Sequence, residues 1–115
     1  MAWGTIEFEP EIQKWLIDLD DQRYGQALMH FDLLEEQGVA LGFPYVRQLD
    51  GKLYELRFYC GGAQQRISHW IAPGRRIIML TVFHKTKSRE TAEVARAKKA
   101  MIVCQDENHT AEEEL

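Results

Sequence analysis

Basic side chains gather in the second half of this 115-residue chain, within and just after a run of apolar segments. An arginine fork binds phosphate through two parallel hydrogen bonds and keeps its charge at every physiological pH. Histidine titrates near neutrality, and a lysine can do so where neighbouring cations depress its pKa. Such a set suits the stabilisation of a pentavalent phosphate and the proton transfers around it. Its members are Arg57, Arg66, Arg75, Arg76, His84, Lys85 and Lys87.

The segment from residue 53 to residue 87 must position these side chains. It reads LYELRFYC, QRISHWI and RIIMLTVFHKTK, with Gly61-Gly62 and Pro73-Gly74 at the breaks, which is typical of an antiparallel meander. Side chains alternate across a strand, so loops at 61–64 and 72–75 predict a cationic face backed by an apolar face. The cationic face is expected to hold Arg57, Tyr59, Arg66, Ser68, Thr81 and Lys85, and the apolar face Leu56, Phe58 and Ile67. The same alternation sends His84 to the face away from Lys85.

Charge is strongly segregated along the chain, although its net value is only −4. Residues 1–46 hold two basic and nine acidic residues, and residues 100–115 hold five acidic residues and no basic one. Residues 47–99 hold twelve basic and four acidic residues, so the basic excess surrounds the meander. This distribution favours a polyanionic partner despite the acidic total. Ion pairing, for example of Arg57 with Glu55 or Glu93, is the alternative use of the same arginines.

The N-terminal part predicts a short strand at residues 3–9 and then two antiparallel helices. Ile12, Trp15, Leu16 and Leu19 follow Pro10 at helical spacing, and a second helix is expected over residues 21–37, before Gly38. A strand near 46–49 and the Asp50-Gly51 turn lead into the meander, whose apolar last run predicts a central strand buried on both sides. A final helix is expected from Ser88 to about Cys104. The prediction is a single domain over residues 1–104 with a flexible acidic tail at 105–115.

Several classes of protein find no support in the sequence. No apolar run approaches the roughly 20 residues of a membrane span, and the acidic start is unlike a signal peptide, so a cytoplasmic protein is expected. Cys60 and Cys104 form no CxxC, and an inert thiol is expected at Cys60. The histidines lack metal-binding spacing, and nucleotide-binding fingerprints are missing. No metal or cofactor is therefore predicted.

The order of these segments resembles HigB-like toxins of the RelE/ParE superfamily, and in particular their phage-derived branch. The similarity covers about residues 3–104 and rests on IEFEPEIQKWLIDL, LLEEQGVALGFPYVRQLDGKLYELRF, QRISHWI and RRIIMLTVFHKTKSRETAEVARAK. It implies an α+β fold in which two N-terminal helices pack on a small twisted antiparallel sheet with a C-terminal helix. It also implies a metal-independent endoribonuclease that cleaves mRNA in the ribosomal A site. The implied partners are the ribosome, mRNA and a HigA-like helix-turn-helix antitoxin, through which the toxin reaches operator DNA.

Residue roles follow from the same resemblance. Arg57 and Arg66 match strand arginines that hold the scissile phosphate, and Lys85 and Lys87 match the basic cluster after the last strand. Proton transfer is then expected from Lys85, Lys87 or His84. The residues expected to bind RNA around this centre are Lys52, Tyr59, Arg75, Arg76 and Arg89.

One departure from the pattern leaves alternatives open. Many relatives carry a tyrosine near the start of the last helix, whereas SRETAEVARA contains no aromatic residue. Either Tyr59, His84 or a lysine replaces it, or nuclease activity is weak or absent. The alternatives are a non-catalytic ParE-type toxin that inhibits DNA gyrase and an inactive toxin that serves only as an antitoxin-bound co-repressor.

Overall fold

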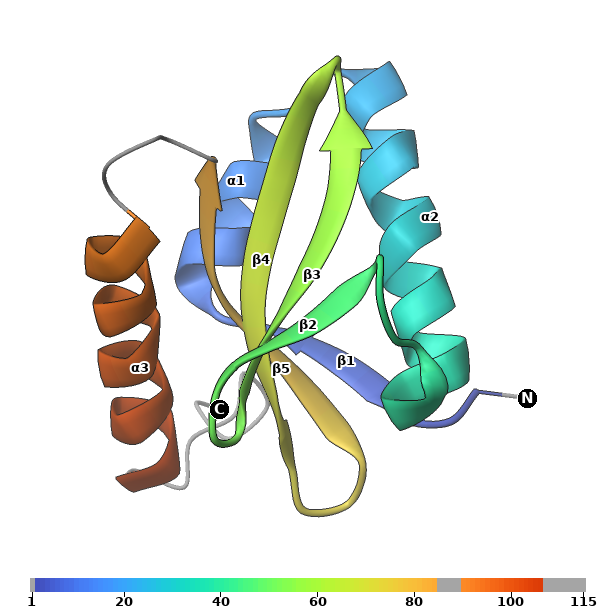
Figure 1. The fold of residues 1–115 in the computed structure, drawn as a ribbon. Coiled ribbons are helices and arrows are strands. Elements are labelled where there is room, and N and C mark those ends of the chain that lie inside the picture. Colours follow the sequence, from blue (N-terminus) through green and yellow to red (C-terminus); the bar gives the residue numbers. More distant parts are fainter. Residues whose placement is uncertain (1, 85–89, 107–115) are drawn as a thin grey trace.

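The protein folds into a five-stranded sheet with helices on both faces (Figure 1). The structure is a computed structural model that describes residues 2–84 and 90–106. Along the chain the elements are β1 (Thr5–Phe8), α1 (Pro10–Ile17), α2 (Asp21–Gln37), the 3-10 helix η1 (Gly38–Ala40), β2 (Val46–Asp50), β3 (Leu53–Cys60), β4 (Ala63–Ala72), β5 (Arg76–His84) and α3 (Glu90–Asp106). No helix among the described residues combines the length and the apolar composition needed to cross a membrane.

The sheet has the strand order β1-β5-β4-β3-β2 and is mixed rather than antiparallel. Strands β2 to β5 form the predicted antiparallel meander, but β1 pairs with β5 in parallel, so the prediction of an antiparallel sheet is wrong. The reason is the connection between β1 and β2. Helices α1 and α2 carry the chain from β1 at one edge of the sheet to β2 at the other edge (Figure 1). Three hairpins then bring the chain back across the sheet, so that β5 lies beside β1 and runs in the same direction as β1.

Two turns set which side chains share a face of the meander. The first turn is Gly61-Gly62 alone, both with positive φ, and it places Arg57 opposite Arg66. The second turn spans residues 73–75, one residue shorter than predicted, which by itself would move Thr81 to the other face. An irregularity in the β4–β5 pairing next to Ser68 restores the predicted face, because Thr81 then lies opposite Ser68.

The larger core lies between the sheet and helices α1 and α2. It contains the helix residues Ile12, Leu16, Ala27, Phe31 and Leu34 and the strand residues Leu56, Phe58, Ile67, Ile77 and Met79. This confirms the apolar face predicted for the meander and the apolar stripe of the first helix. The start of α2 lies at the border of this core, because Tyr24 is 43% exposed.

Helix α3 covers part of the opposite face of the sheet (Figure 1). Ala97 and Cys104 pack there in a second buried cluster with Leu53, Trp70, Ala72, Ile78 and Leu80. Strand β5 contributes Ile77 and Met79 to one core and Ile78 and Leu80 to the other, which confirms the strand buried on both sides. The rest of this face, toward the β3–β4 turn, carries the polar and basic side chains of the candidate site.

Candidate functional site

A single buried carboxylate organises the basic face of the sheet. Glu55 on β3 is fully buried, and Arg66 donates to it from Nε at 2.5 Å and from Nη2 at 2.8 Å. Arg47 donates from Nε at 3.0 Å and from Nη2 at 2.8 Å, while Arg57 Nε lies 4.0 Å from the same carboxylate. These four residues are called the arginine cluster below. Three guanidinium groups thus surround one carboxylate, and the formal charges of these four residues sum to +2.

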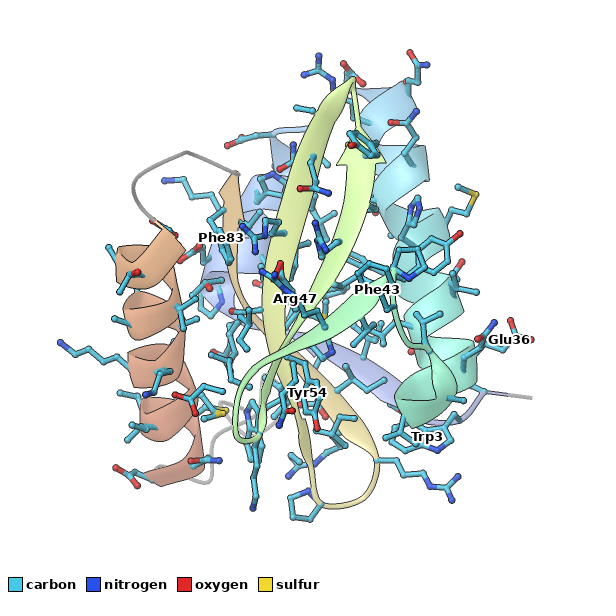
Figure 2. The ribbon with its side chains drawn as sticks, viewed as in Figure 1. Trp3, Glu36, Phe43, Arg47, Tyr54 and Phe83 are labelled. Atoms are coloured by element: carbon cyan, nitrogen blue, oxygen red, sulfur yellow. The ribbon has the colours of Figure 1, made fainter. Side chains whose placement is uncertain are left out.

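The sheet register explains why these residues meet. Arg47 of β2 lies opposite Glu55, and Arg57 lies opposite Arg66. Glu55 and Arg57 are two residues apart on one strand and therefore point to the same face. Figure 2 shows Arg47 in front of β3 and β4, on the face of the sheet that α3 leaves open. The cluster thus spans three neighbouring strands, β2, β3 and β4.

The three arginines differ in their access to solvent. The Arg66 side chain is 3% exposed and its guanidinium lies 5.0 Å from the centre of the Phe83 ring, so it serves as an interior anchor. The side chains of Arg57 and Arg47 are 20% and 38% exposed. Arg57 Nε has no hydrogen-bond partner among the described residues. An incoming anion would therefore meet Arg57 and Arg47, with Glu55 and Arg66 holding them from behind.

Ser68 and Thr81 form the inner border of the cluster. Their hydroxyl oxygens lie 2.5 Å apart, and the Thr81 amide donates to Ser68 Oγ at 3.0 Å. Both side chains are buried, and Ser68 lies opposite Glu55 across β3 and β4. They confirm the face predicted by alternation. Because the two residues satisfy each other's hydrogen-bonding groups, they make the border of the cluster rigid and do not offer a further group to a ligand.

The other residues predicted for the site are only partly brought together. Tyr59 is 68% exposed near the end of β3, two residues after Arg57. Lys52 lies in the β2–β3 turn and lines a separate pocket of about 560 Å³ with Trp3, Tyr54 and Arg75. This pocket does not include any residue of the arginine cluster.

Arg75 and Arg76 lie at the opposite end of β4 and β5 from Arg66. The Arg75 guanidinium sits 5.2 Å from the centre of the Trp3 ring and donates to the Trp3 carbonyl, while Arg76 Nε donates to the Pro73 carbonyl. The structure therefore separates them from the cluster with which the sequence grouped them. Their proposed role in RNA binding stays a prediction.

The end of β5 carries the remaining candidates. The backbone of His84, the last residue of β5, pairs with Gln65, and the face predicted for its side chain stays a prediction. Lys85, Lys87 and Arg89 lie outside the described residues, and so does the proposed helix start at Ser88. In α3, Arg96 is engaged by Glu11 at 2.6 Å and by Glu93 at 3.0 Å, and these carboxylates raise its pKa. The charge of Arg96 is thus compensated by two carboxylates.

Burial favours the neutral form of three titratable side chains outside the arginine cluster, those of His69, Cys60 and Cys104. Burial lowers the pKa of His69 to about 4, and its ring stacks against Tyr54. Burial likewise raises the pKa of the thiols of Cys60 and Cys104, which favours the inert state expected for Cys60. Within residues 2–84 and 90–106, no three His, Cys, Asp or Glu side chains come together in a group that could hold a metal ion.

Sequence reasoning missed Arg47 and the central place of Glu55. Glu55 was considered only as an alternative partner of Arg57, although its position two residues before Arg57 put it on the same face. Arg47 could have been found from the Asp50-Gly51 turn, which folds β2 back along β3. The sequence could not show that three arginines surround Glu55, because this depends on the register of the β2–β3 and β3–β4 hairpins.

Comparison with known proteins gives a family and a fold. Residues 14–102 match the model of the family described as phage derived protein Gp49-like (DUF891). A mutant of E. coli toxin RelE in the free state aligns with a TM-score of 0.59 and 15% identity, over 84% of this chain and 94% of that one. The RelBE2 toxin–antitoxin complex from Mycobacterium tuberculosis gives a TM-score of 0.52 and 17% identity, over 71% of this chain and 98% of that one. No curated protein sequence matches.

Proposed function

Because this chain belongs to the phage-derived Gp49-like family and has the fold of RelE toxins, we propose that it is the toxin of a type II toxin–antitoxin system. We further propose that it is a HigB-like endoribonuclease that cleaves mRNA in the ribosomal A site without a metal ion. The observation that carries the proposal is the arginine cluster, a positively charged group held on the open part of the sheet by one buried carboxylate.

In the proposed reaction the 2′-hydroxyl of one nucleotide attacks the adjacent phosphorus. A base removes the hydroxyl proton, the bond to the 5′-oxygen breaks, and an acid protonates that oxygen, which leaves a 2′,3′-cyclic phosphate and a free 5′-hydroxyl. Arg57 and Arg47 stabilise the negative charge on the non-bridging oxygens, because they are the solvent-accessible guanidinium groups of the cluster. Lys85, Lys87 or His84 is proposed to supply the proton transfers.

Glu55 and Arg66 have a positioning role in this proposal. Both are buried, and their paired hydrogen bonds fix the orientation of the Glu55 carboxylate, to which Arg47 donates and beside which Arg57 lies. Preorganised charges act on a transition state without a cost of reorientation. This refines the role expected for Arg66, which was to hold the scissile phosphate.

The partners follow from the proposed system. The ribosome would position the message, and a HigA-like helix-turn-helix antitoxin would neutralise the toxin and bring it to operator DNA. The basic excess of residues 47–99 suits an RNA substrate. The acidic N-terminal segment supplies few cations of its own, so RNA is expected on the meander side that carries the arginine cluster.

The test is induced expression followed by primer extension on cellular mRNA. Wild-type protein should create new, translation-dependent 5′ ends, and Arg57→Ala should reduce their rate of formation by about 100-fold. Lys14→Ala is the matched control, because it removes an exposed cation from α1, on the other side of the sheet, and should leave cleavage unchanged.

Three outcomes would contradict parts of the proposal. Full cleavage by a folded Arg57→Ala protein would overturn the site assignment. Intact messages with induced DNA damage would favour inhibition of gyrase. Repression that requires the antitoxin, without any toxicity of the chain alone, would favour a co-repressor.

A further inference from the structure

An aromatic cleft adjoins the arginine cluster at the edge of β3. Its walls include His30, Phe43, Tyr45, Arg57, Tyr59 and Gln64, and its volume is about 350 Å³. Strand β2 pairs with β3 only up to Val46 opposite Leu56. The Tyr45 carbonyl accepts from the Arg57 amide at 2.7 Å, so the preceding loop holds its rings beside the last residues of β3.

Three aromatic side chains of the cleft are exposed to solvent. Phe43 is 79% exposed, Tyr59 is 68% exposed and Tyr45 is 41% exposed. Behind them the His30 ring stacks on Phe58 with a centroid distance of 4.7 Å and an interplanar angle of 15°. Its Nδ1 donates to the Gln26 carbonyl at 2.8 Å, which fixes the ring. The floor is thus rigid, while the outer rings are free to stack on a ligand.

Arg57 belongs to both sites. Its Nε lies 4.0 Å from Glu55, and Arg57 is also one of the residues that line the cleft. A cation beside exposed aromatic rings matches the chemistry of a nucleotide, in which a phosphate adjoins a planar base. Stacking on aromatic rings is how proteins bind unpaired bases, and Gln64 adds an amide that can donate to and accept from a base edge.

We propose that this cleft binds one unpaired nucleobase of RNA, next to the phosphate held by the arginine cluster. The inference rests on the proposed nuclease function and adds to it a subsite for a base. The volume lies within the range typical of small-ligand sites. The aromatic ring missing from the start of the last helix is then replaced by rings on β3 and the loop before β2.

The test measures binding of a fluorescein-labelled 2′-O-methyl tetranucleotide and of the same oligonucleotide with one base removed. Both lack the attacking 2′-hydroxyl, so they cannot be cleaved. Removing the base should weaken binding to the wild type roughly tenfold or more. Phe43→Ala and Tyr59→Ala should weaken binding of the intact oligonucleotide by a similar factor and leave binding of the abasic one unchanged.

Conservative variants provide the matched controls. Phe43→Tyr and Tyr59→Phe keep the ring and should bind both oligonucleotides like the wild type. Both side chains are largely exposed, so none of these substitutions should change the urea midpoint by more than a small amount. A loss that is equal for intact and abasic RNA would show a contribution to phosphate binding only and would overturn the proposal.

Two further results would also overturn it. One is a wild-type protein that binds intact and abasic oligonucleotides equally, or binds neither. The other is a loss of antitoxin affinity in Phe43→Ala and Tyr59→Ala without any loss of RNA affinity, which would make the cleft a protein interface. Failure of the nuclease proposal is distinguishable, because cells would then show intact mRNA while base-dependent binding persisted.

Discussion

Removing the charge of Glu55 should be among the most destabilising single substitutions in this protein. Glu55→Gln preserves the shape of the side chain but leaves Arg66, whose side chain is 3% exposed, without its buried counter-charge. Breaking a buried ion pair by removing one partner costs about 3–5 kcal/mol. The total stability of a domain is only about 5–15 kcal/mol, so the variant should be folded but fragile.

Urea denaturation at pH 7, followed by tryptophan fluorescence, measures this effect. With a slope of about 1.5 kcal/mol per molar urea, the midpoint should fall by roughly 2–3 M. Arg66→Met should cost less than Glu55→Gln, because Glu55 keeps Arg47 and Arg57 as partners. Glu55→Leu combined with Arg66→Met should recover much of the loss, since an apolar pair of similar volume can replace a buried ion pair.

Lys98→Ala provides the matched control. Lys98 and Asp50 form an ion pair at 2.6 Å, but their side chains are 45% and 50% exposed, so its loss should cost at most about 1 kcal/mol. If Glu55→Gln moved the urea midpoint no further than Lys98→Ala, Glu55 would not be the shared counter-ion of the cluster. The positioning role proposed for Glu55 and Arg66 would then be refuted.

Two further predictions concern a buried histidine and a helix end. The pKa of His69 is about 4 in the folded protein and 6.5 unfolded, so only the unfolded chain gains this proton as the pH falls from 7 toward 4. The free energy of unfolding should therefore be about 2 kcal/mol lower at pH 5 than above pH 6.5. In His69→Gln this part of the pH dependence, measured by urea denaturation, should be lost. An unchanged profile in the variant would contradict a neutral His69. Gly38→Ala should cost about 2–3 kcal/mol, because φ is +54° and the new methyl group would collide with the Trp3 ring. Gly25→Ala, where the methyl group meets no atom within 4 Å, should instead stabilise α2 by roughly 0.5–1 kcal/mol, and equal midpoints for the two variants would refute the argument.

The sequence alone was sufficient to predict the helices and strands and much of the cationic face of the sheet. The second helix has the predicted bounds, residues 21–37, because its Asp20 cap and Gly38 end are local signals. Arg57 and Arg66 share a face because alternation along a strand is also local, and the Gly61-Gly62 turn preserves it. Thr81 was placed correctly for a different reason, since a shorter turn and an irregular pairing next to Ser68 compensate for each other.

Only the tertiary structure decided what these residues do together. It pairs β1 with β5 in parallel, moves Arg75 and Arg76 to the far end of the sheet, and brings Arg47 onto Glu55. It also assembles the aromatic cleft from α2, the loop before β2 and the end of β3. These features depend on contacts between segments far apart in the chain. Alternation along a strand determines on which face of the sheet a side chain lies. The register of the hairpins and the helical connection between β1 and β2 determine which side chains it contacts there.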